Sequence, residues 1–246
     1  MKCVILAAGI GKRLRPHTAK TPKCLLSVGG KTLLERAIEA VLANGIREIT
    51  IVTGFEEAKI RAKVSRVFPH LQVTFLHNTR FRTTNNAYSL LLARDFAQHS
   101  PFLLLDSDIL FPSALLDMLA TAQRKPNRIA VRVTGDHDNE EIRVKINRWD
   151  HILEIGKHIP LSETFGESVG IEIFSAPASK ALFEIIDGRV KKGAGKKEFY
   201  EASFQEMIDT GTRVWAIDIS RFPVLEIDTL PDLAAAGKIV STIDHA

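Results

Sequence analysis

The sequence predicts an α/β fold, a doubly wound, mostly parallel sheet with a small mixed β extension. In the first half, short apolar runs alternate with segments of helical periodicity, and repeated units of this kind favour a parallel sheet with right-handed crossovers. After about residue 126, strand-like runs follow one another through short polar turns, which is typical of antiparallel pairing. The chain has 246 residues, 45% of them hydrophobic, which is enough for one sizeable domain.

The first half supplies the strands and helices of the parallel sheet. The first predicted strand, Lys2–Ala8, is almost continuously apolar, as expected of a parallel strand covered on both faces. The helix Leu33–Leu42 carries its apolar residues on one stripe, and Asn44-Gly45 is a typical helix C-terminus. Ser113 is a candidate N-cap for the last helix of this half. The other expected elements are the strands Glu48–Thr53, Leu71–Leu76 and Phe102–Leu105 and the helices Glu56–Val67, Asn85–Phe96 and Ser113–Gln123.

The second half mixes strands and helices. Polar turns separate the candidate strands Arg128–Val133, Glu141–Asn147 and His151–Gly156, which form the predicted extension. The sequence shows no internal repeat and no long linker, so we expect a single domain over residues 1–246. The remaining elements are the strands Val169–Phe174 and Arg213–Ile217 and the helices Pro177–Ile186, Phe199–Thr210 and Pro231–Val240.

Composition narrows the classes of partner. The net charge is only +4, and much of the excess lies in Arg189–Lys197, where two glycines predict a solvated loop. No aromatic residues alternate with these cations to stack bases, so a nucleic-acid partner is not expected. No apolar run approaches the roughly 18 residues of a membrane span, and no signal peptide is evident. The two cysteines, Cys3 and Cys24, are too few for a disulfide scaffold, so we expect a cytoplasmic protein without a membrane partner.

The end of the first strand carries a phosphate-binding pattern. Gly9 and Gly11 allow backbone N–H groups to approach an anion closely. Arg13 offers a planar fork of donors for phosphate oxygens, whereas Lys23 acts as a point charge. These residues follow the carboxyl end of a strand, where ligands bind in open α/β sheets. The sequence therefore predicts a nucleoside triphosphate site here.

Two common phosphate motifs are excluded. The third glycine of a G-x-G-x-x-G fingerprint would fall on Leu14, which disfavours a nicotinamide-dependent oxidoreductase. Gly30-Lys31-Thr32 looks like the end of a Walker A loop, but the glycine required earlier would be Leu25. Neither a dinucleotide site nor a P-loop is therefore predicted.

A longer signature remains. From Leu6 to Lys23 the chain reads L-A-A-G-x-G-x-R-L-x-P and then P-K, which resembles the nucleotidyltransferases that activate phosphorylated sugars and alcohols. The resemblance extends from Val4 to about Leu233. It implies a Rossmann-like nucleotide-diphospho-sugar transferase fold, with a nucleotide-binding half (about 1–125) and an acceptor-binding half (about 126–246). It also implies catalytic phosphate contacts from Arg13 and Lys23, and nucleotide contacts from Leu6, Ala7, Ala8, Gly9, Gly11 and Lys12.

Two acidic segments indicate a Mg²⁺ site. Asp106 and Asp108 follow an apolar strand, and Mg²⁺ is usually held by one or two carboxylates together with substrate phosphates. The resemblance assigns the metal to Asp108 and to Asp228, the first Asp of a late E-I-D-T-x-x-D-L element. Asp106 then contributes to the nucleotide site or forms a strand-end turn. The alternative for Asp228 is an N-cap shared with Thr229, and Asp232 is expected in the first turn of the following helix.

The segment His77–Leu90 narrows the nucleotide. It resembles the N-x-x-x-x-x-x-N-N-x-Y-S-L of phosphocholine-type cytidylyltransferases, which implies CTP as the preferred triphosphate. Asn86 and Ser89 are the candidate contacts to the pyrimidine, because amide and hydroxyl groups match its mixed donor and acceptor edge. Either Asn85 or Asn86 can also cap the following helix, and Tyr88 is expected to pack.

The acceptor side is less well defined. Ile155-Gly156-Lys157 resembles an element whose lysine meets the acceptor phosphate, so Lys157 is assigned a catalytic role. The resemblance also places Glu172, Tyr200 and Glu201 at the acceptor. Choline-specific members tend to have an aromatic residue where this chain has Ile142. An inositol phosphate, an aminoethyl phosphonate or a sugar phosphate therefore remains open beside phosphocholine.

Together these residues predict a Mg²⁺-dependent cytidylyltransferase that transfers CMP from CTP to a phosphorylated alcohol such as phosphocholine and releases pyrophosphate. The first alternative is a sugar-1-phosphate or inositol-phosphate nucleotidyltransferase that uses UTP, dTTP or CTP. The second is a regulatory module that binds nucleotide without turnover. We expect the protein to be a monomer or a homodimer.

Overall fold

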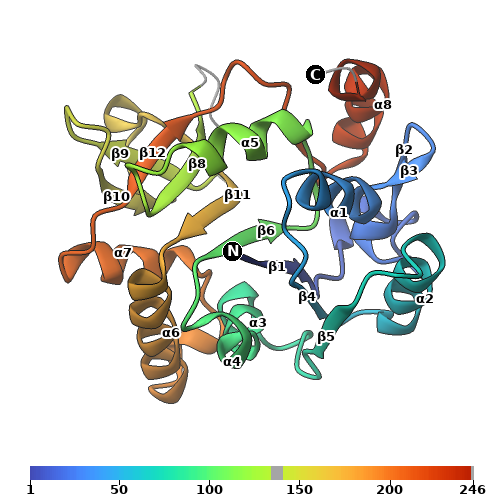
Figure 1. Cartoon of the computed structure of the whole chain (residues 1–246), viewed down its shortest axis with the longest axis horizontal. Helices are drawn as coiled ribbons and strands as arrows, with labels where there is room; N and C mark the ends of the chain where they lie inside the picture. The colour runs from blue at the N-terminus through green and yellow to red at the C-terminus, as the bar shows by residue number, and fades with distance from the viewer. Residues whose placement is uncertain (134–140, 245–246) are drawn as a thin grey trace.

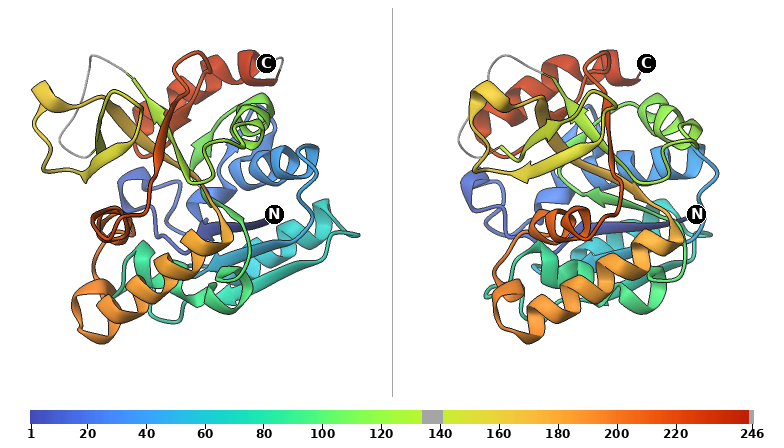
Figure 2. Two further views of the ribbon diagram at one scale, coloured as in Figure 1. Left: turned by 60° about the vertical axis from the view of Figure 1, so that its left-hand side comes forward. Right: turned by 90° about the vertical axis from the view of Figure 1, so that its left-hand side faces the viewer.

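The computed structural model describes residues 1–133 and 141–244. Within these residues, nine strands form one sheet whose main path is β10-β9-β11-β6-β1-β4-β5, with β8 and β12 attached beside β11 (Figure 1). Helices cover both faces of this sheet (Figures 1 and 2). The predicted doubly wound, mostly parallel α/β architecture is confirmed, and the mixed extension belongs to the same sheet. No helix among the described residues is both long and apolar enough to cross a bilayer.

The parallel part of the sheet comes from the first half of the chain. Strand β1 (Lys2–Ala7) lies between β4 (Ile49–Thr53) and β6 (Phe102–Asp106), and β5 (Val73–His77) lies beyond β4; all these neighbours are parallel. Strand β1 is buried almost throughout, which explains its continuous apolar sequence. The connecting helices are α1 (Leu33–Ala43), α2 (Glu57–Val67), α3 (Asn86–Leu92), α4 (Arg94–Ala97) and α5 (Ser113–Thr121).

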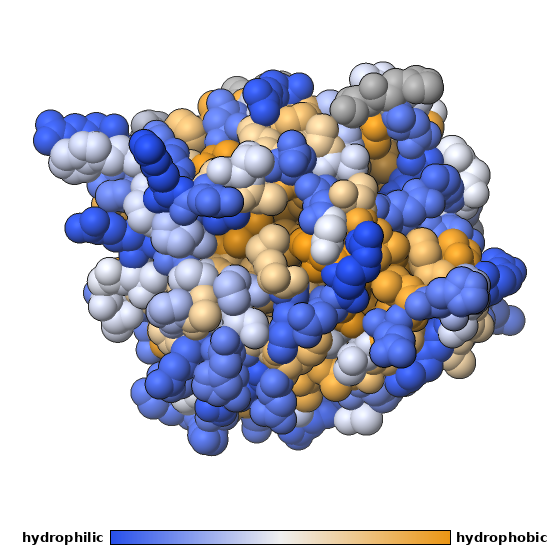
Figure 3. Space-filling view, viewed as in Figure 1, coloured by the Kyte–Doolittle hydropathy of each residue, from blue (hydrophilic) through white to orange (hydrophobic). Residues whose placement is uncertain are grey.

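The two faces of the sheet bury separate apolar cores. Alternate residues of β1 point to opposite faces, so Cys3 and Ile5 pack in one core and Val4 and Leu6 in the other. The first core lies under α1, α2 and α5, and the second under α3, α6 (Ala176–Lys191) and α7 (Glu201–Asp209). On the side seen in Figure 3, apolar side chains gather near the middle and hydrophilic ones surround them.

The second half extends the sheet. Strand β11 (Gly166–Phe174) is antiparallel to β6 and carries the sheet into β8 (Arg128–Arg132) and β9 (Arg143–Ile146). Figure 2 shows β9 and its partner β10 (Ile152–Gly156) at the end of the molecule away from α2. Strand β12 (Trp215–Asp218) pairs with β8 in parallel. Strands from both halves therefore meet at β6 and β11.

The short elements differ from the predictions. The segment predicted as one helix from Asn85 to Phe96 is two helices, α3 and α4, that meet at Ala93. The first residue of α5 is Ser113, and its N-cap is Pro112, so the predicted Ser113 cap is wrong. Two-residue strands carry no periodicity, and the strand pairs they form escaped prediction. The two pairs are β2 (Ser27–Val28) with β3 (Lys31–Thr32), and β7 (Ile109–Leu110) with β13 (Leu225–Glu226). The structure also contains four single-turn helices, Lys12–Leu14, Lys23–Leu25, Leu161–Glu163 and Ala194–Lys196.

The last helix, α8 (Leu230–Asp244), packs against β2, β7 and β13. It buries Ala236 and Ile243 in a third apolar cluster together with Leu14 and Val28. Its start is capped reciprocally: the Asp232 carboxylate accepts from the backbone N–H of Thr229 (2.7 Å), and the Asp232 N–H donates to the Thr229 hydroxyl (3.4 Å). Asp232 also accepts from the backbone N–H of Asp228 (3.0 Å), so this cap fixes the chain on both sides of Thr229.

Replacing Thr229 with alanine is expected to lower the free energy of unfolding by about 1 kcal/mol, because the helix loses a side-chain cap. Urea denaturation followed by circular dichroism measures this loss. Ser241→Ala, an exposed site within the same helix, is the matched control and should change the free energy by less than about 0.5 kcal/mol. Equal losses for both variants would show that the cap contributes nothing specific.

Candidate active site

A cleft of about 830 Å³ opens where the carboxyl ends of β1 and β6 meet the start of β11. Its walls come from both halves of the chain, as expected of a site that brings two substrates together. Most of the predicted site residues line it: Leu6, Ala7, Ala8, Gly9, Gly11, Lys12, Arg13, Lys23, Asn86, Ser89, Asp106, Asp108, Lys157, Glu201 and Asp228. Glu172 and Tyr200 do not.

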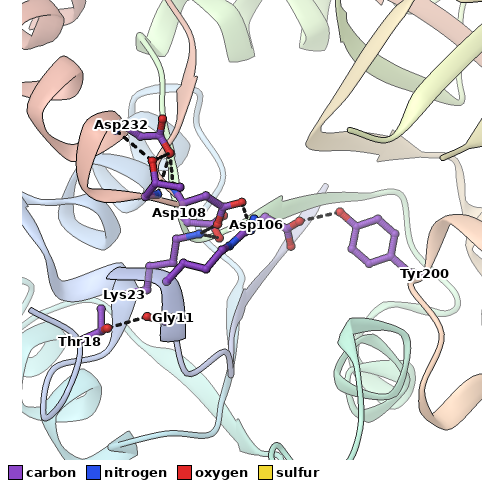
Figure 4. A network of polar contacts seen from close by, with 10 residues as sticks. Gly11, Thr18, Lys23, Asp106, Asp108, Tyr200 and Asp232 are labelled. Carbon is purple, nitrogen blue, oxygen red and sulfur yellow. Dashed lines mark hydrogen bonds and ion pairs between the residues drawn. The ribbon is translucent and has the colours of Figure 1, made fainter. Parts of the chain in front are cut away.

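The loop that follows β1, which the sequence predicts to bind phosphate, is held in place by contacts among its own residues. Gly11 has a φ of +62°, a conformation that favours glycine. A Cβ at this position would lie 3.2 Å from the Cβ of Lys23 and from a methyl carbon of Thr18, so a side chain would also crowd the loop. The Thr18 hydroxyl donates to the Gly11 carbonyl at 2.6 Å (Figure 4). The glycine therefore sets the path of the loop as it leaves β1.

A network of charges occupies one end of the cleft (Figure 4). The Lys23 ammonium group donates to Asp108 at 2.6 Å and also to Asp228, and Arg13 forms a second ion pair with Asp228. Burial alone would lower the pKa of Lys23, but the carboxylates of Asp108 and Asp228 outweigh it and raise the pKa above its usual value. Lys23 is therefore a permanent cation at this end of the site.

The acidic residues of this network fit a divalent cation. Asp108, Glu226 and Asp228 each present a carboxylate oxygen, and these oxygens lie within 4.8 Å of one another. The Oδ1 atom of Asp108 is buried and has no hydrogen-bond partner among the described residues. Glu226 is exposed to solvent, whereas Asp108 and Asp228 are half-buried. Carboxylate oxygens are the ligands that Mg²⁺ prefers, so these three residues would hold it.

The fold brings these carboxylates together across 120 residues of sequence. Strand β7 directly follows Asp108, and it pairs with β13, which contains Glu226. The Ile227 N–H donates to the Asp108 carbonyl at 3.0 Å. Glu226 was missed in the sequence, although its spacing of two from Asp228 would have placed both on one side of an extended segment.

The cap of α8 leaves Asp228 in the cleft. Thr229 and Asp232 make the capping contacts, so the N-cap alternative for Asp228 is wrong. Asp232 lies in the first turn of the helix, as expected. The carboxylate of Asp228 instead contacts Arg13 and Lys23, and these partners hold its pKa below the usual value although burial would raise it.

The predicted base contacts lie at the start of α3. Asn85 caps this helix by accepting from the Asn86 N–H at 2.8 Å. The Asn86 side-chain oxygen accepts from the Tyr200 N–H (2.9 Å), and the Ser89 hydroxyl oxygen accepts from the Asn78 amide (3.0 Å). Each of these oxygens therefore accepts one hydrogen bond from within the protein, and the Asn86 amide and the Ser89 hydroxyl still have hydrogens to donate.

Two of the residues predicted to contact the acceptor, Tyr200 and Glu172, do not face the cleft. Tyr200 is completely buried, and its hydroxyl donates to Asp106 at 2.8 Å, so it lies beneath the cleft instead of flanking an acceptor. Glu172 is also completely buried, since it lies within β11 opposite Leu104 of β6. The aromatic side chain that does line the cleft is that of Phe199, whose ring centroid is 5.1 Å from the Lys157 ammonium nitrogen.

Sequence reasoning also missed an arginine in the wall. Arg132, at the end of β8, lines the cleft and forms an ion pair of 2.5 Å with Glu167 at the start of β11. No motif marked it, because its place depends on the pairing of two strands that are far apart in the sequence. Arg132 therefore adds an ion-paired guanidinium group to the wall that the second half of the chain forms.

Comparisons with known proteins identify the family of the chain. The family model for the MobA-like NTP transferase domain matches residues 3–202. The choline-phosphate cytidylyltransferase of Streptococcus pneumoniae is 36% identical over 243 residues, which are 98% of each chain. The 2-aminoethylphosphonate cytidylyltransferase of Lancefieldella rimae is 28% identical over 239 residues, covering 94% of this chain and 90% of that protein.

Solved structures agree on the fold. The inositol-1-phosphate CTP transferase from T. maritima superimposes with a TM-score of 0.82 at 22% identity, covering 100% of this chain and 96% of the other. The CTP:phosphocholine cytidylyltransferase of Streptococcus pneumoniae gives a TM-score of 0.78 at 23% identity, covering 97% and 98%. The family model and the full-length relatives show that the chain belongs to the MobA-like NTP transferase family and is a nucleotidyltransferase.

Proposed function

We propose that the protein transfers CMP from CTP to a small phosphorylated or phosphonylated acceptor and releases pyrophosphate. The observation that carries this proposal is the distribution of charge along one cleft. Arg13 and Lys23 lie with Asp108 and Asp228 at the nucleotide end, and Lys157 lines the acceptor half. Two full-length relatives are named as cytidylyltransferases, which supports CTP as the nucleotide.

The chemistry requires positioning more than proton transfer. An oxygen of the acceptor phosphate attacks the α-phosphorus of CTP in line, a new P–O bond forms, and the bond to the bridging oxygen of the β-phosphate breaks. The electron pair leaves with pyrophosphate. A phosphate monoester has a second pKa of about 6 and is largely dianionic at pH 7, so no general base is needed. Lys157 holds the acceptor oxygens, while Arg13 and Lys23 neutralise the triphosphate.

Mg²⁺ fits this scheme through the three carboxylates of Asp108, Glu226 and Asp228. When bound, it supplies positive charge to the triphosphate oxygens and so stabilises the departing pyrophosphate. The protein's contribution is to hold three acidic side chains from two distant segments in one place. Lys23 contacts two of these carboxylates, so its cation also limits their mutual repulsion.

The base preference follows from the donors at α3. Cytosine presents two neighbouring acceptors, O2 and N3, whereas N3 of uracil and thymine carries a hydrogen and is a donor. We assign the amide of Asn86 and the hydroxyl of Ser89 as donors to the base; each of their oxygens already accepts one hydrogen bond, from the Tyr200 N–H and the Asn78 amide. A uracil would place a donor against a donor and leave both without a partner, which costs binding free energy.

Pyrophosphate release tests the proposal. The purified protein is assayed with Mg²⁺ and CTP, UTP, dTTP, GTP or ATP against phosphocholine, inositol 1-phosphate, 2-aminoethylphosphonate and several sugar 1-phosphates. Turnover with CTP and one alcohol phosphate or phosphonate is expected. Turnover restricted to UTP or dTTP with a sugar phosphate would contradict the assignment of Asn86 and Ser89. Binding of CTP without turnover for any pair would indicate a regulatory module.

A further inference from the structure

Strand β10 leads into Lys157, the lysine assigned to the acceptor phosphate, and it is the outermost strand of the main path through the sheet. One side of β10 pairs with β9. The other side contacts α7 (Figure 1). An outermost strand leaves backbone N–H and C=O groups unpaired unless another element satisfies them. The position of Lys157 therefore depends on what holds the outer side of β10.

One side chain of α7, that of Gln205, bonds to two backbone groups on this outer side. Its Oε1 atom accepts from the Ile155 N–H at 2.8 Å, and its Nε2 atom donates to the Leu153 carbonyl at 3.2 Å. The side-chain amide thus bonds to β10 as the backbone of a neighbouring strand would. The same Nε2 atom donates to Asp209, one turn further along α7, at 2.8 Å, which fixes the orientation of the amide.

These bonds set the position of α7 along β10. Apolar residues of both elements, Ile152 and Ile155 from the strand and Phe204 and Met207 from the helix, belong to the same core. Apolar contacts are non-directional, whereas hydrogen bonds weaken steeply when their geometry changes. The two bonds of Gln205 to the strand therefore resist a shift of α7 along β10.

The residues that follow β10 and precede α7 meet in the cleft. Lys157, two residues after Ile155, and Phe199, just before α7, both line it, and the Lys157 ammonium nitrogen lies 5.1 Å from the Phe199 ring centroid. The Lys157 carbonyl accepts from the buried guanidinium group of Arg143 at 3.3 Å, so β9 holds the same turn from the opposite side. A shift of α7 along β10 would move these two cleft residues relative to each other.

We propose that Gln205 is a positioning residue for the acceptor: it fixes α7 along β10 and so places the Lys157 ammonium group where the acceptor phosphate binds. This inference rests on the proposed cytidylyl transfer and concerns the same site. Gln205 does not line the cleft, so it acts through Lys157 instead of touching the substrate. A displacement of about 1 Å in a group that orients a substrate is enough to change the reaction rate strongly.

Gln205→Leu tests the proposal, because leucine retains an apolar side chain but has neither donor nor acceptor. We expect KM for the acceptor to rise at least about tenfold while KM for CTP stays within about twofold of its original value. Gln98→Leu is the matched control and should change neither KM; Gln98 is a half-buried glutamine at the end of α4 whose side chain accepts from Arg94 at 2.9 Å. An unchanged KM for the acceptor, or equal increases for both substrates, would overturn the inference.

A double-mutant cycle distinguishes positioning from a merely structural role. If Gln205 acts through Lys157, adding Gln205→Leu to a Lys157→Met protein should raise the acceptor KM by less than about twofold further. Full additivity of the two substitutions would show that Gln205 acts independently of Lys157 and would contradict the proposal.

Phosphate binding separates this inference from the proposed function. Isothermal titration calorimetry with inorganic phosphate is carried out on protein saturated with α,β-methylene-CTP, which cannot release pyrophosphate. We expect Gln205→Leu to weaken phosphate binding at least about fivefold and Gln98→Leu to leave it unchanged. This result in a protein that turns over none of the acceptors would support the positioning role and refute the proposed function. Phosphate binding that is absent, or equal in the unaltered protein and the Gln205 variant, would overturn the positioning role whatever the turnover.

Discussion

Replacing Asp228 with asparagine is expected to lower kcat for pyrophosphate release by about 10²- to 10³-fold, corresponding to about 3–4 kcal/mol in the barrier. Asp228 contributes one of the three oxygens that would hold the metal, and its other contacts are Arg13 and Lys23. Asparagine keeps the size and loses the charge, so the substitution weakens the metal site and releases the two cations from their common partner. Steady-state pyrophosphate release over a range of Mg²⁺ concentrations measures both effects.

The control for this prediction is Asp117→Asn, an exposed aspartate on α5. It should leave kcat and the Mg²⁺ dependence as they are in the unaltered protein. The Asp228 variant should remain folded, with a circular dichroism spectrum like that of the control. Full activity of a folded Asp228→Asn protein at low Mg²⁺ would exclude this carboxylate from the metal site.

Replacing Lys23 with methionine is expected to lower both the free energy of unfolding and the rate of pyrophosphate release. The Lys23 side chain is 11% exposed and lies between Asp108 and Asp228. Its removal leaves the acidic residues without their shared cation, which should lower the free energy of unfolding by about 3 kcal/mol, as for other buried ion pairs that lose one partner. Mg²⁺ should restore part of this loss, because a divalent cation can neutralise the same carboxylates. Urea denaturation with and without Mg²⁺ measures the loss and its recovery.

The control is a surface ion pair of similar geometry. Lys31 and Glu39 are separated by 2.7 Å, and both side chains are about half exposed. Lys31→Met should therefore change the free energy of unfolding by less than about 1 kcal/mol, with no dependence on Mg²⁺. If Lys23→Met changed the free energy of unfolding as little as Lys31→Met does, and also without any dependence on Mg²⁺, the charge network would not depend on Lys23.

The parallel half of the fold, and the end of the cleft that carries Gly9, Gly11 and Arg13, were predictable because the sequence patterns that mark them are local. Strand β1 is a run of apolar residues, and its carboxyl end is followed at once by the glycines and by Arg13, so sequence order and spatial order coincide. Strand β6 is likewise an apolar run, and its polar residue Asp106 stands at its carboxyl end. The periodicity of apolar residues and the position of polar residues at strand ends are sufficient to predict such features.

The acceptor half depends on contacts that periodicity does not encode. Whether Tyr200 and Glu172 face the cleft or lie beneath it depends on how α7 packs on the sheet and on the pairing of β11 with β6 and β8. Glu226 joins the candidate metal site only because the two-residue strands β7 and β13 pair. Such placements arise from tertiary packing, so residue types in this half were readable from the sequence, but their depth and their neighbours were not.

The hydrogen bonds between α3 and the segment before α7 limit how this protein can be re-engineered. The Asn86 side chain accepts from the Tyr200 N–H, and the Asn85 N–H donates to the Lys196 carbonyl at 2.8 Å. The two segments are more than 100 residues apart, yet each satisfies the other's backbone. Residues 194–200 contribute only backbone groups to these bonds, so a graft of this segment preserves them as long as its backbone follows the same path. A substitution at Asn86, in contrast, removes a predicted base contact and at the same time leaves the Tyr200 N–H without this partner.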